Sequence, residues 1–196
     1  KVEFEKKYKL KIIENYGLTE TLWLSCNLPK ERNNLNVGKL FDGVKLKIKK
    51  RNKTDLYGEI LVKTKYLFVK MFVNNKFKYP KKNKWFYTGD LGYIDKDKRL
   101  QITGRKKDII IKNGLNISPK KIENAIFQNK NIMDCCVVGI KNSISGENIL
   151  ALISLKNNNI KTKSQLKKIF NKLLIKQEHP DEVKIIQNIP KNSNGK

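Results

Sequence analysis

The sequence predicts an α+β protein with a β-rich first half and a mixed second half. In residues 1–104, short β-branched and aromatic runs recur between Gly, Asn and Lys clusters, namely KLKI (45–48), EILV (59–62) and YLFV (66–69). In residues 105–196, apolar runs of strand length alternate with segments of helical periodicity. With 196 residues, the chain can form one large domain or two small ones.

The first half closes with a predicted β-hairpin. Residues 93–103 read as two strand arms around the polar turn DKDK. Strand character then gives way to GRKKD, so the domain border is expected near Thr103–Asp108. We therefore expect one domain over residues 1–104 and another over 105–196.

The second half has the pattern β-α-β-β-α-β. Ser118 followed by Pro119 is typical of a helix N-terminus, and apolar residues then recur at i, i+3 and i+4, so a helix is predicted over 119–129. The other predicted elements are strands at 135–140 and 149–155, a helix at 163–176, and a last strand at 182–186.

The strong positive charge does not indicate nucleic-acid binding. The formal net charge is +25, but 39 of the 43 basic residues are Lys, and Arg is the residue favoured for phosphate and base recognition. The lysines are spread along the whole chain without a basic tail or stripe. We therefore expect no nucleic-acid partner.

Cysteine usage and hydropathy exclude several other classes of protein. Three Cys and one His make neither a disulfide framework nor a zinc site, which favours a reducing cytoplasm. The sequence has no apolar run of about 18 residues and no secretory signal pattern, so no transmembrane segment is expected.

Four short motifs carry residues suited to nucleotide chemistry. They are YGLTE (16–20), YTGD (87–90), GRKKDIIIKNGLNISPKKIE (104–123) and PKNSNGK (190–196). In the first motif, an aromatic ring can stack on a base, a glycine lets backbone approach a ligand, a hydroxyl can donate to phosphate, and a carboxylate can bind Mg²⁺. An ordinary polar loop would explain the same residues equally well.

The other two short motifs are ambiguous when each is read alone. Asp90 can accept both hydroxyls of a ribose, although a β-turn also favours Asp. Lys196 can neutralise charge that develops on a phosphate, although a basic tail looks the same. The order of the four motifs is more specific than any one of them.

Taken in order, the motifs resemble the C-terminal third of the adenylate-forming superfamily, and the resemblance runs from Tyr16 to Lys196. This superfamily includes acyl- and aryl-CoA synthetases, fatty acyl-AMP ligases, luciferases and peptide-synthetase adenylation domains. Within the superfamily, the motifs of this chain most resemble those of fatty acyl-CoA synthetases and fatty acyl-AMP ligases. The resemblance implies the β-rich end of a large N-terminal adenylation domain followed by a small, mobile α+β C-terminal domain.

The resemblance implies a ligase that joins a carboxylic acid to AMP from ATP and then transfers the acyl group to a thiol. The implied cofactors are ATP and Mg²⁺, and the acceptor is CoA or the phosphopantetheine of an acyl carrier protein. In such enzymes the match to Tyr16 packs on adenine, Asp90 and Arg105 hold the ribose, and Thr19 contacts the α-phosphate. The full nucleotide set is Tyr16, Gly17, Thr19, Asp90, Ile102 and Arg105, with Glu20 as the metal ligand.

Three further roles follow from the same resemblance. Lys196 bridges phosphate and carboxylate, so Lys196, Thr19 and Glu20 are the implied catalytic residues. Lys107 is the hinge about which the small domain swings between the two half-reactions. After the swing, a Gly-containing turn, Asn113-Gly114-Leu115, faces the path of the thiol acceptor.

The chain departs from the family pattern at several positions. Asn113 stands where Gly is frequent, Lys121 where an acidic residue is frequent, and Met71 where Gly is common. Some thioester-forming members carry Lys at the position of Ile111. The glycine-rich loop that grips the β- and γ-phosphates is not among these residues, and we expect it upstream of Lys1, so these 196 residues alone are expected to be inactive.

Two alternatives remain open from the sequence. One is a nucleotide-binding relative without chemistry, and the other is an amino-acid-activating adenylation domain.

Overall fold

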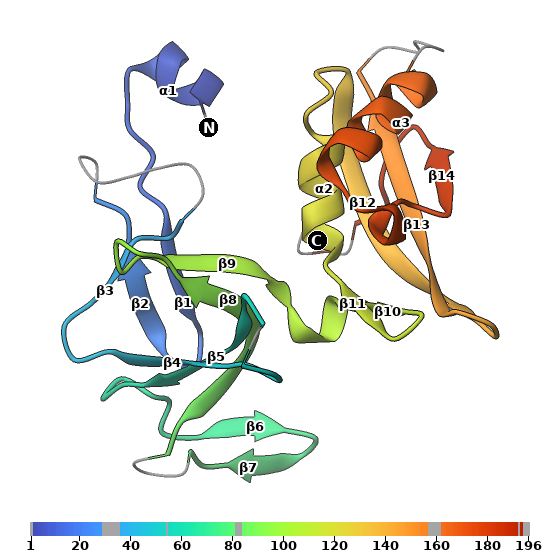
Figure 1. The fold of residues 1–196 in the computed structure, drawn as a ribbon. Coiled ribbons are helices and arrows are strands. Elements are labelled where there is room, and N and C mark those ends of the chain that lie inside the picture. Colours follow the sequence, from blue (N-terminus) through green and yellow to red (C-terminus); the bar gives the residue numbers. More distant parts are fainter. Residues whose placement is uncertain are drawn as a thin grey trace. The chain divides into compact units, whose positions relative to one another are not determined.

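The computed structural model describes residues 2–28, 36–53, 55–80, 84–156, 162–191 and 193. The chain forms two compact units, Lys1–Lys106 and Lys107–Lys196 (Figure 1). The border lies two residues beyond the one expected from the sequence, at a short 3₁₀ turn, η1 (Lys106–Asp108). Together the units make an α+β fold, as predicted.

An antiparallel four-stranded sheet of order β4-β5-β8-β9 forms the body of the first unit. The strands predicted at 45–48 and 59–62 and the hairpin at 93–103 are all present in it. Its strands are β4 (Lys45–Lys49), β5 (Gly58–Lys63), β8 (Phe86–Ile94) and β9 (Leu100–Arg105).

A second, three-stranded sheet packs its apolar side chains into the same core. It contains β1 (Asn15–Leu18), β2 (Leu22–Cys26) and β3 (Lys39–Leu40), and a short helix α1 (Val2–Tyr8) precedes it. The core of this unit consists of Tyr16, Leu24, Val44, Ile60, Val62 and Leu100, from both sheets.

The strand predicted at 66–69 is wrong. Val69 is 82% exposed, while the Phe68 amide donates to the Glu20 carbonyl at 2.8 Å and the Phe68 ring lies edge-on to Phe86. Residues with high β-propensity therefore form no strand where no neighbouring strand can hydrogen-bond to them. The pairing occurs just afterwards, between β6 (Met71–Val73) and β7 (Lys76–Lys78).

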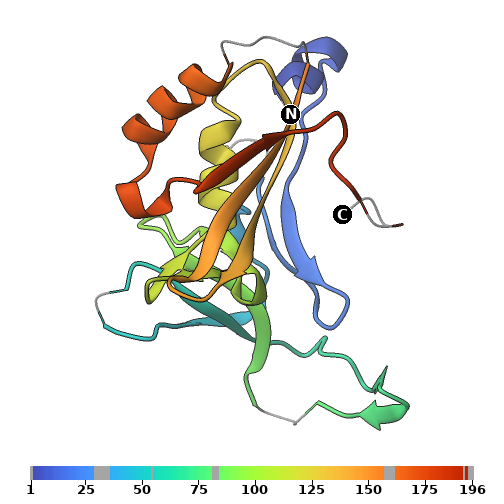
Figure 2. The same ribbon diagram turned by 90° about the vertical axis from the view of Figure 1, so that its right-hand side faces the viewer.

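The second unit places two helices on one face of a sheet (Figure 2). The sheet order is β11-β10-β13-β12, and β14 pairs in parallel with β13. The elements are β10 (Ile110–Lys112), β11 (Leu115–Ile117), α2 (Pro119–Ile126), β12 (Ile132–Asn142), β13 (Gly146–Leu155), α3 (Thr162–Leu173), the 3₁₀ turn η2 (Lys176–Glu178) and β14 (Glu182–Ile185).

Both helices are shorter than the sequence predicts. Helix α2 ends at Ile126 instead of residue 129, because the amides of Gln128 and Asn129 turn to the carbonyls three residues before them. The apolar stripes nevertheless face the sheet as expected, with Ile122 and Ile126 fully buried. Each such side chain contributes about 1.5–3 kcal/mol through burial.

One carboxylate joins three strands of this second sheet. Strands β10 and β14 follow one another along the same edge of β13. Asp181, just before β14, accepts hydrogen bonds from the Ile149 amide at 2.7 Å and from Lys112 Nζ at 2.5 Å. Its side chain therefore connects β10, β13 and β14.

None of the helices in the described ranges is both long and apolar enough to cross a membrane.

Candidate active site

Three predicted nucleotide-binding residues meet in the first unit. Asp90 on β8 and Arg105 on β9 are direct cross-strand partners, and Arg105 Nε lies 3.2 Å from Asp90 Oδ1. From the other sheet, the Tyr16 hydroxyl donates to Asp90 Oδ2 at 2.7 Å. Only 6% of the Asp90 side chain is exposed, so a buried carboxylate is held by one donor on each oxygen.

The local geometry of YTGD aims this carboxylate. The Asp90 amide donates to Thr88 Oγ1 at 3.1 Å, and the Thr88 hydroxyl donates to the Ile60 carbonyl at 2.9 Å. Gly89 has φ of +74°, in the left-handed region that favours glycine. Threonine, glycine and aspartate thus each have a structural reason to stand in this order.

Tyr16 has a second role that sequence reasoning missed. Its ring belongs to the core of the first unit and is 9% exposed, so only a small part of it is open to a ligand. Burial raises the pKa of the Tyr16 phenol well above its usual range, and the adjacent Asp90 carboxylate adds to the rise. The phenol therefore remains a hydrogen-bond donor to Asp90 at any physiological pH.

The rest of YGLTE forms the β1–β2 turn. A Cβ on Gly17 would lie 2.4 Å from the Leu22 carbonyl oxygen, so close strand approach already requires glycine there. Thr19 is exposed and Glu20 partly exposed in the turn itself. Tyr16 lies three residues before Thr19 in the sequence, on β1, which ends at Leu18.

The candidate metal ligand Glu20 does not belong to a cluster. Within the described ranges, no group of three or more His, Cys, Asp or Glu side chains could hold a metal ion. Mg²⁺ commonly takes one or two carboxylates and completes its shell with water and substrate phosphates. A single carboxylate in an accessible turn fits that chemistry.

The remaining predicted residues lie apart from the three-residue contact. Ile102 on β9 pairs with Gly92 and packs against the core of the first unit. Lys107 is exposed in η1, at the border between the units. Lys196 lies outside the described residues.

The proposed acceptor path is the turn of the β10–β11 hairpin. Asn113 and Gly114 have φ of +50° and +76°, which makes a two-residue turn between paired strands. The Asn113 amide donates to the Ser145 carbonyl at 2.8 Å, so the turn is tied to the β12–β13 connection. A groove beside it is lined by Ile109, Ile111, Lys141, Asn142, Ser143, Gly146 and Glu147.

Sequence reasoning also missed an ion pair beside the site. Lys106 Nζ lies 2.7 Å from Glu59 Oε2, and the Glu59 side chain is almost fully buried. Glu59 pairs with Leu91 across the sheet, one residue from Asp90. The ion pair therefore joins β5 to the 3₁₀ turn η1 that follows β9.

Comparisons with known proteins show which enzymes the chain is similar to. Residues 121–196 match the AMP-binding enzyme C-terminal domain. The chain is 34% identical over 194 residues to the putative acyl–CoA ligase YdaB of Bacillus subtilis, which covers 94% of this chain and 38% of the relative. It is 30% identical over 190 residues to the 2-succinylbenzoate–CoA ligase of Lactococcus lactis, which covers 95% and 40%.

Solved structures show the same fold. Coronafacic acid ligase from Pectobacterium brasiliense superimposes with a TM-score of 0.78 at 25% identity, over 96% of this chain and 38% of that one. The chain thus spans about two fifths of the length of the curated relatives it matches. By motif order, sequence and fold, the chain belongs to the adenylate-forming superfamily, in which it corresponds to the C-terminal part of the acyl-CoA ligases.

Proposed function

We propose that the complete protein activates a carboxylic acid with ATP. The acid oxygen attacks the α-phosphorus, the bond to the β-phosphate breaks, and acyl-AMP and pyrophosphate result. The observation that carries this proposal is the buried Asp90 carboxylate held between Tyr16 and Arg105. A carboxylate can accept about four hydrogen bonds, so both oxygens of Asp90 keep capacity for ribose hydroxyls.

We assign the charge-handling roles to three further residues. Glu20 would hold Mg²⁺, which offsets the repulsion between an anionic acid and an anionic triphosphate when it is bound. Thr19 would donate to the α-phosphate, and Lys196 would bridge this phosphate and the acid. Removing one such charge is expected to lower the rate on the order of 10²–10³-fold.

In the second half-reaction, a thiolate attacks the acyl carbonyl and AMP leaves. We propose that the second unit swings about Lys107 between the two steps, which brings the Asn113-Gly114-Leu115 turn to the acceptor. CoA and a carrier-bound phosphopantetheine present the same pantetheine thiol, and either fits this proposal. We place the reaction in the cytoplasm, where the free thiols of the chain also stay reduced.

The acid is the least determined part of the proposal. The segments YGLTETLWLS and NGLNISPKKIE resemble those of fatty acyl-CoA synthetases and fatty acyl-AMP ligases more than those of amino-acid-activating domains, which favours a fatty acid. One relative is named for 2-succinylbenzoate, a different class of acid, so family membership leaves the acid open.

The decisive test is ATP–pyrophosphate exchange by the complete protein, with acids from acetate to long-chain fatty acids, aromatic acids and amino acids. Exchange with one acid class would name the substrate. Asp90→Asn should weaken ATP binding, and Lys196→Ala should lower exchange on the order of 10²–10³-fold while ATP still binds. Asp97→Asn is the matched control, because Asp97 is an exposed carboxylate in the turn of the same hairpin.

Failure of exchange with every acid, in a protein that binds ATP through Asp90, would refute the ligase reaction. It would leave the second candidate, a nucleotide-binding relative without chemistry.

A further inference from the structure

Within the second unit, burial holds the β10–β11 hairpin only at its base. Ile110 and Ile117, a register pair of β10 and β11, are 1% and 3% exposed. Nearer the turn, Ile111 is 53% and Leu115 is 44% exposed. Hydrogen bonds rather than buried apolar side chains therefore fix the direction of the Asn113-Gly114-Leu115 turn.

The ladder between this hairpin and the rest of the sheet is short. In the described part of the chain, β10 meets β13 at one register pair, Lys112 with Gly146. Because the turn has two residues, Lys112 and Leu115 form the hydrogen-bonded pair that closes the hairpin, and the Ile111 amide points away from β11. This amide therefore needs an acceptor from outside its own hairpin.

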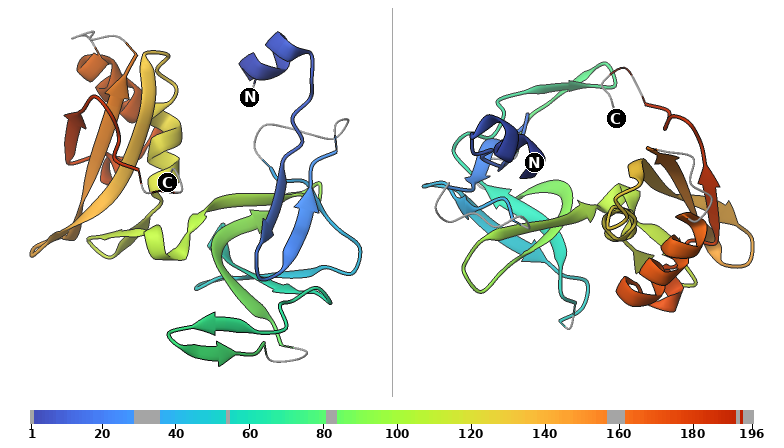
Figure 3. Two further views of the ribbon diagram at one scale, coloured as in Figure 1. Left: turned by 180° about the vertical axis from the view of Figure 1, so that it is seen from behind. Right: turned by 90° about the horizontal axis from the view of Figure 1, so that it is seen from above.

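A carboxylate on β13 supplies that acceptor. Glu147 Oε2 lies 2.6 Å from the Ile111 amide nitrogen, shorter than the usual N–H···O distance. Glu147 directly follows Gly146, so its side chain extends the ladder between β10 and β13 by one bond. Figure 3 shows, in its left view, the end of the β12–β13 hairpin beside the β10–β11 hairpin.

A glycine on the neighbouring strand leaves room for this carboxylate. A Cβ on Gly139 of β12 would lie 2.7 Å from Glu147 Oε1 and 3.2 Å from the carboxylate's other oxygen. Gly139 pairs in regular register with Ile149 of β13, a strand position that does not itself require glycine. The place of the Glu147 carboxylate accounts for the glycine.

A second path leads from Glu147 to the turn itself. The Asn113 amide donates to the Ser145 carbonyl at 2.8 Å. The Ser145 hydroxyl in turn lies 3.1 Å from the Glu147 carbonyl and 2.8 Å from Asn148 Oδ1. Glu147 thus contacts β10 through its side chain, and its backbone is connected through Ser145 to the first residue of the turn.

We propose that Glu147 is a positioning residue for the thioester half-reaction, because it holds the Asn113-Gly114-Leu115 turn toward the thiol acceptor. This inference rests on the proposed function and concerns only its second step. A misplacement of about 1 Å can cost on the order of 10²-fold in rate, so a bond beside the turn can matter to a reaction that Glu147 does not touch. Adenylation is assigned to residues of the first unit and Lys196, so it should not depend on Glu147.

The two half-reactions of the complete protein are measured separately. ATP–pyrophosphate exchange reports adenylation of the acid that supports it fastest, and the preformed adenylate of that acid reports transfer, with CoA and pantetheine as probe thiols. Glu147→Ala should lower the kcat of transfer on the order of 10–100-fold and leave exchange within about twofold of the parent. Glu147→Gln keeps an oxygen acceptor for the Ile111 amide, so transfer should stay within about fivefold of the parent.

Gly139→Ala tests the same contact without a change at Glu147. The added methyl group displaces the carboxylate, which is the far end of a flexible side chain, so the fold should tolerate the substitution. Transfer should fall on the order of tenfold. When Glu147 is already Ala, adding Gly139→Ala should have almost no further effect, because the atoms that the methyl group displaces are gone.

Glu182→Ala is the matched control. Glu182 is an exposed carboxylate on β14 of the same unit, 3.3 Å from the exposed Lys184 ammonium group. Its loss removes the same charge and should leave both half-reactions unchanged. Amide exchange followed by mass spectrometry should show faster exchange in β10 and β11 for Glu147→Ala and parent rates there for Glu182→Ala.

Three outcomes would overturn the inference while the proposed function stands. One is an equal loss of exchange and transfer in Glu147→Ala, which would indicate a general loss of folded enzyme. Another is equal loss of transfer in Glu147→Ala and Glu147→Gln, since the charge and not the acceptor oxygen would then act. The third is a parent protein that catalyses exchange but transfers to neither thiol. Failure of exchange with every acid would instead refute the proposed function, and this inference with it.

Discussion

Replacing Tyr16 by Phe isolates the hydrogen bond that supports the candidate nucleotide site. The ring stays in the core, so no cavity forms, and only the donor to Asp90 Oδ2 is removed. The O···O distance of 2.7 Å is in the range of charge-assisted bonds, and hydrogen bonds to charged groups contribute about 1.5–3 kcal/mol. Because the Asp90 side chain is 6% exposed, water replaces the lost donor poorly.

We therefore expect Tyr16→Phe to lower the unfolding free energy of the first unit by about 2 kcal/mol. The two tryptophans of the chain, Trp23 and Trp85, both lie in that unit. Tryptophan emission during urea titration consequently reports its unfolding without a contribution from the second unit. The urea dependence of the free energy should stay unchanged while the midpoint falls.

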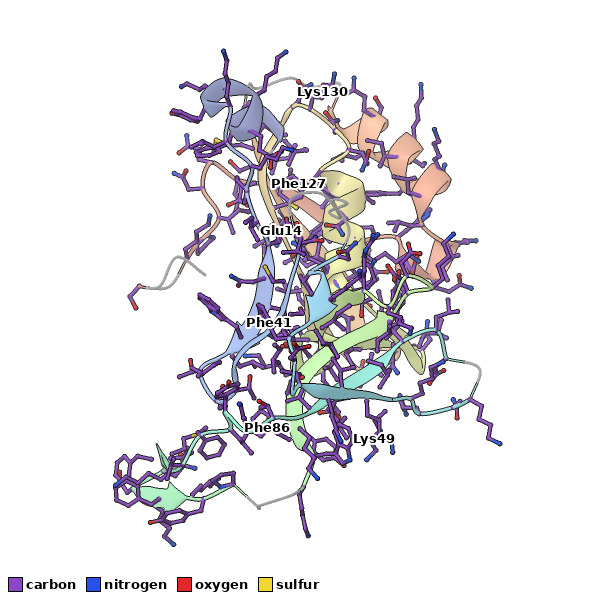
Figure 4. All side chains as sticks on the ribbon, turned by 90° about the vertical axis from the view of Figure 1, so that its left-hand side faces the viewer. Glu14, Phe41, Lys49, Phe86, Phe127 and Lys130 are labelled. Carbon is purple, nitrogen blue, oxygen red and sulfur yellow. The ribbon has the colours of Figure 1, made fainter. Side chains whose placement is uncertain are left out.

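Tyr87→Phe is the matched control. Tyr87 is half exposed on β8, and its hydroxyl lies 3.4 Å from the exposed Lys49 Nζ, too long for a strong bond (Figure 4 labels Lys49). Its loss should cost less than about 0.5 kcal/mol. Equal midpoints for the two variants would show that the Tyr16–Asp90 hydrogen bond contributes nothing to the unfolding free energy. The inference that Tyr16 holds the Asp90 carboxylate in place would then be wrong.

Three further predictions concern the second unit. Gly114→Ala, at φ of +76°, should destabilise the β10–β11 turn by about 1 kcal/mol, seen as faster amide exchange in β10 and β11. Burial of Asp181 opposes ionisation, but its bonds from Lys112 and the Ile149 amide outweigh this and lower its pKa. The stabilisation is thus present above the ordinary carboxyl pKa and lost as pH falls through the lowered value. Circular dichroism should therefore show Asp181→Asn less stable than the parent at pH 7, with a difference that shrinks as the pH falls below the ordinary carboxyl pKa. Burial raises the pKa of the Cys135 thiol to about 12, so peptide mass mapping after iodoacetamide at pH 8 should find Cys135 unmodified until urea is added; modification under native conditions would contradict this burial.

The elements that the sequence predicted well are those whose signals are local. Ser118-Pro119 and the apolar spacing that follows define α2, and the strand arms around DKDK define β8 and β9. The helix ends were misjudged because the end of α2 depends on where backbone amides find carbonyls, which periodicity does not encode.

Of two hairpin turns whose residues carry a local signal, one was missed and the other was expected only through the family resemblance. Asn113-Gly114 stands between β10 and β11, and Asn74-Asn75 stands between β6 and β7, each with both residues at positive φ. Asn-Gly between apolar runs favours this turn type, and Asn tolerates the same backbone region. The β-rich YLFV run predicted a strand at 66–69, just before the Asn74-Asn75 turn, and no hairpin was predicted there.

The central contact of the site could not be predicted from local pattern. Tyr16 and Asp90 are 74 residues apart, and their bond depends on how the β1–β2 sheet meets the four-stranded sheet. The motifs identified the participants only through family resemblance. They did not indicate that the tyrosine belongs to the core or that it supports the aspartate.

The residues proposed to hold the ribose and the lysine proposed to act in only one step belong to different units. Asp90 and Arg105 are register partners on β8 and β9, and both groups that hold the Asp90 carboxylate belong to the first unit. Arg105 is followed by only one more residue before the border at Lys107. Because the donors to Asp90 come from sheets on one side of that border, the swing that we propose for the second unit need not change the proposed ribose site. Lys196 stands on the other side in sequence, so the proposed swing about Lys107 would withdraw the lysine while the contacts of Asp90 keep their geometry.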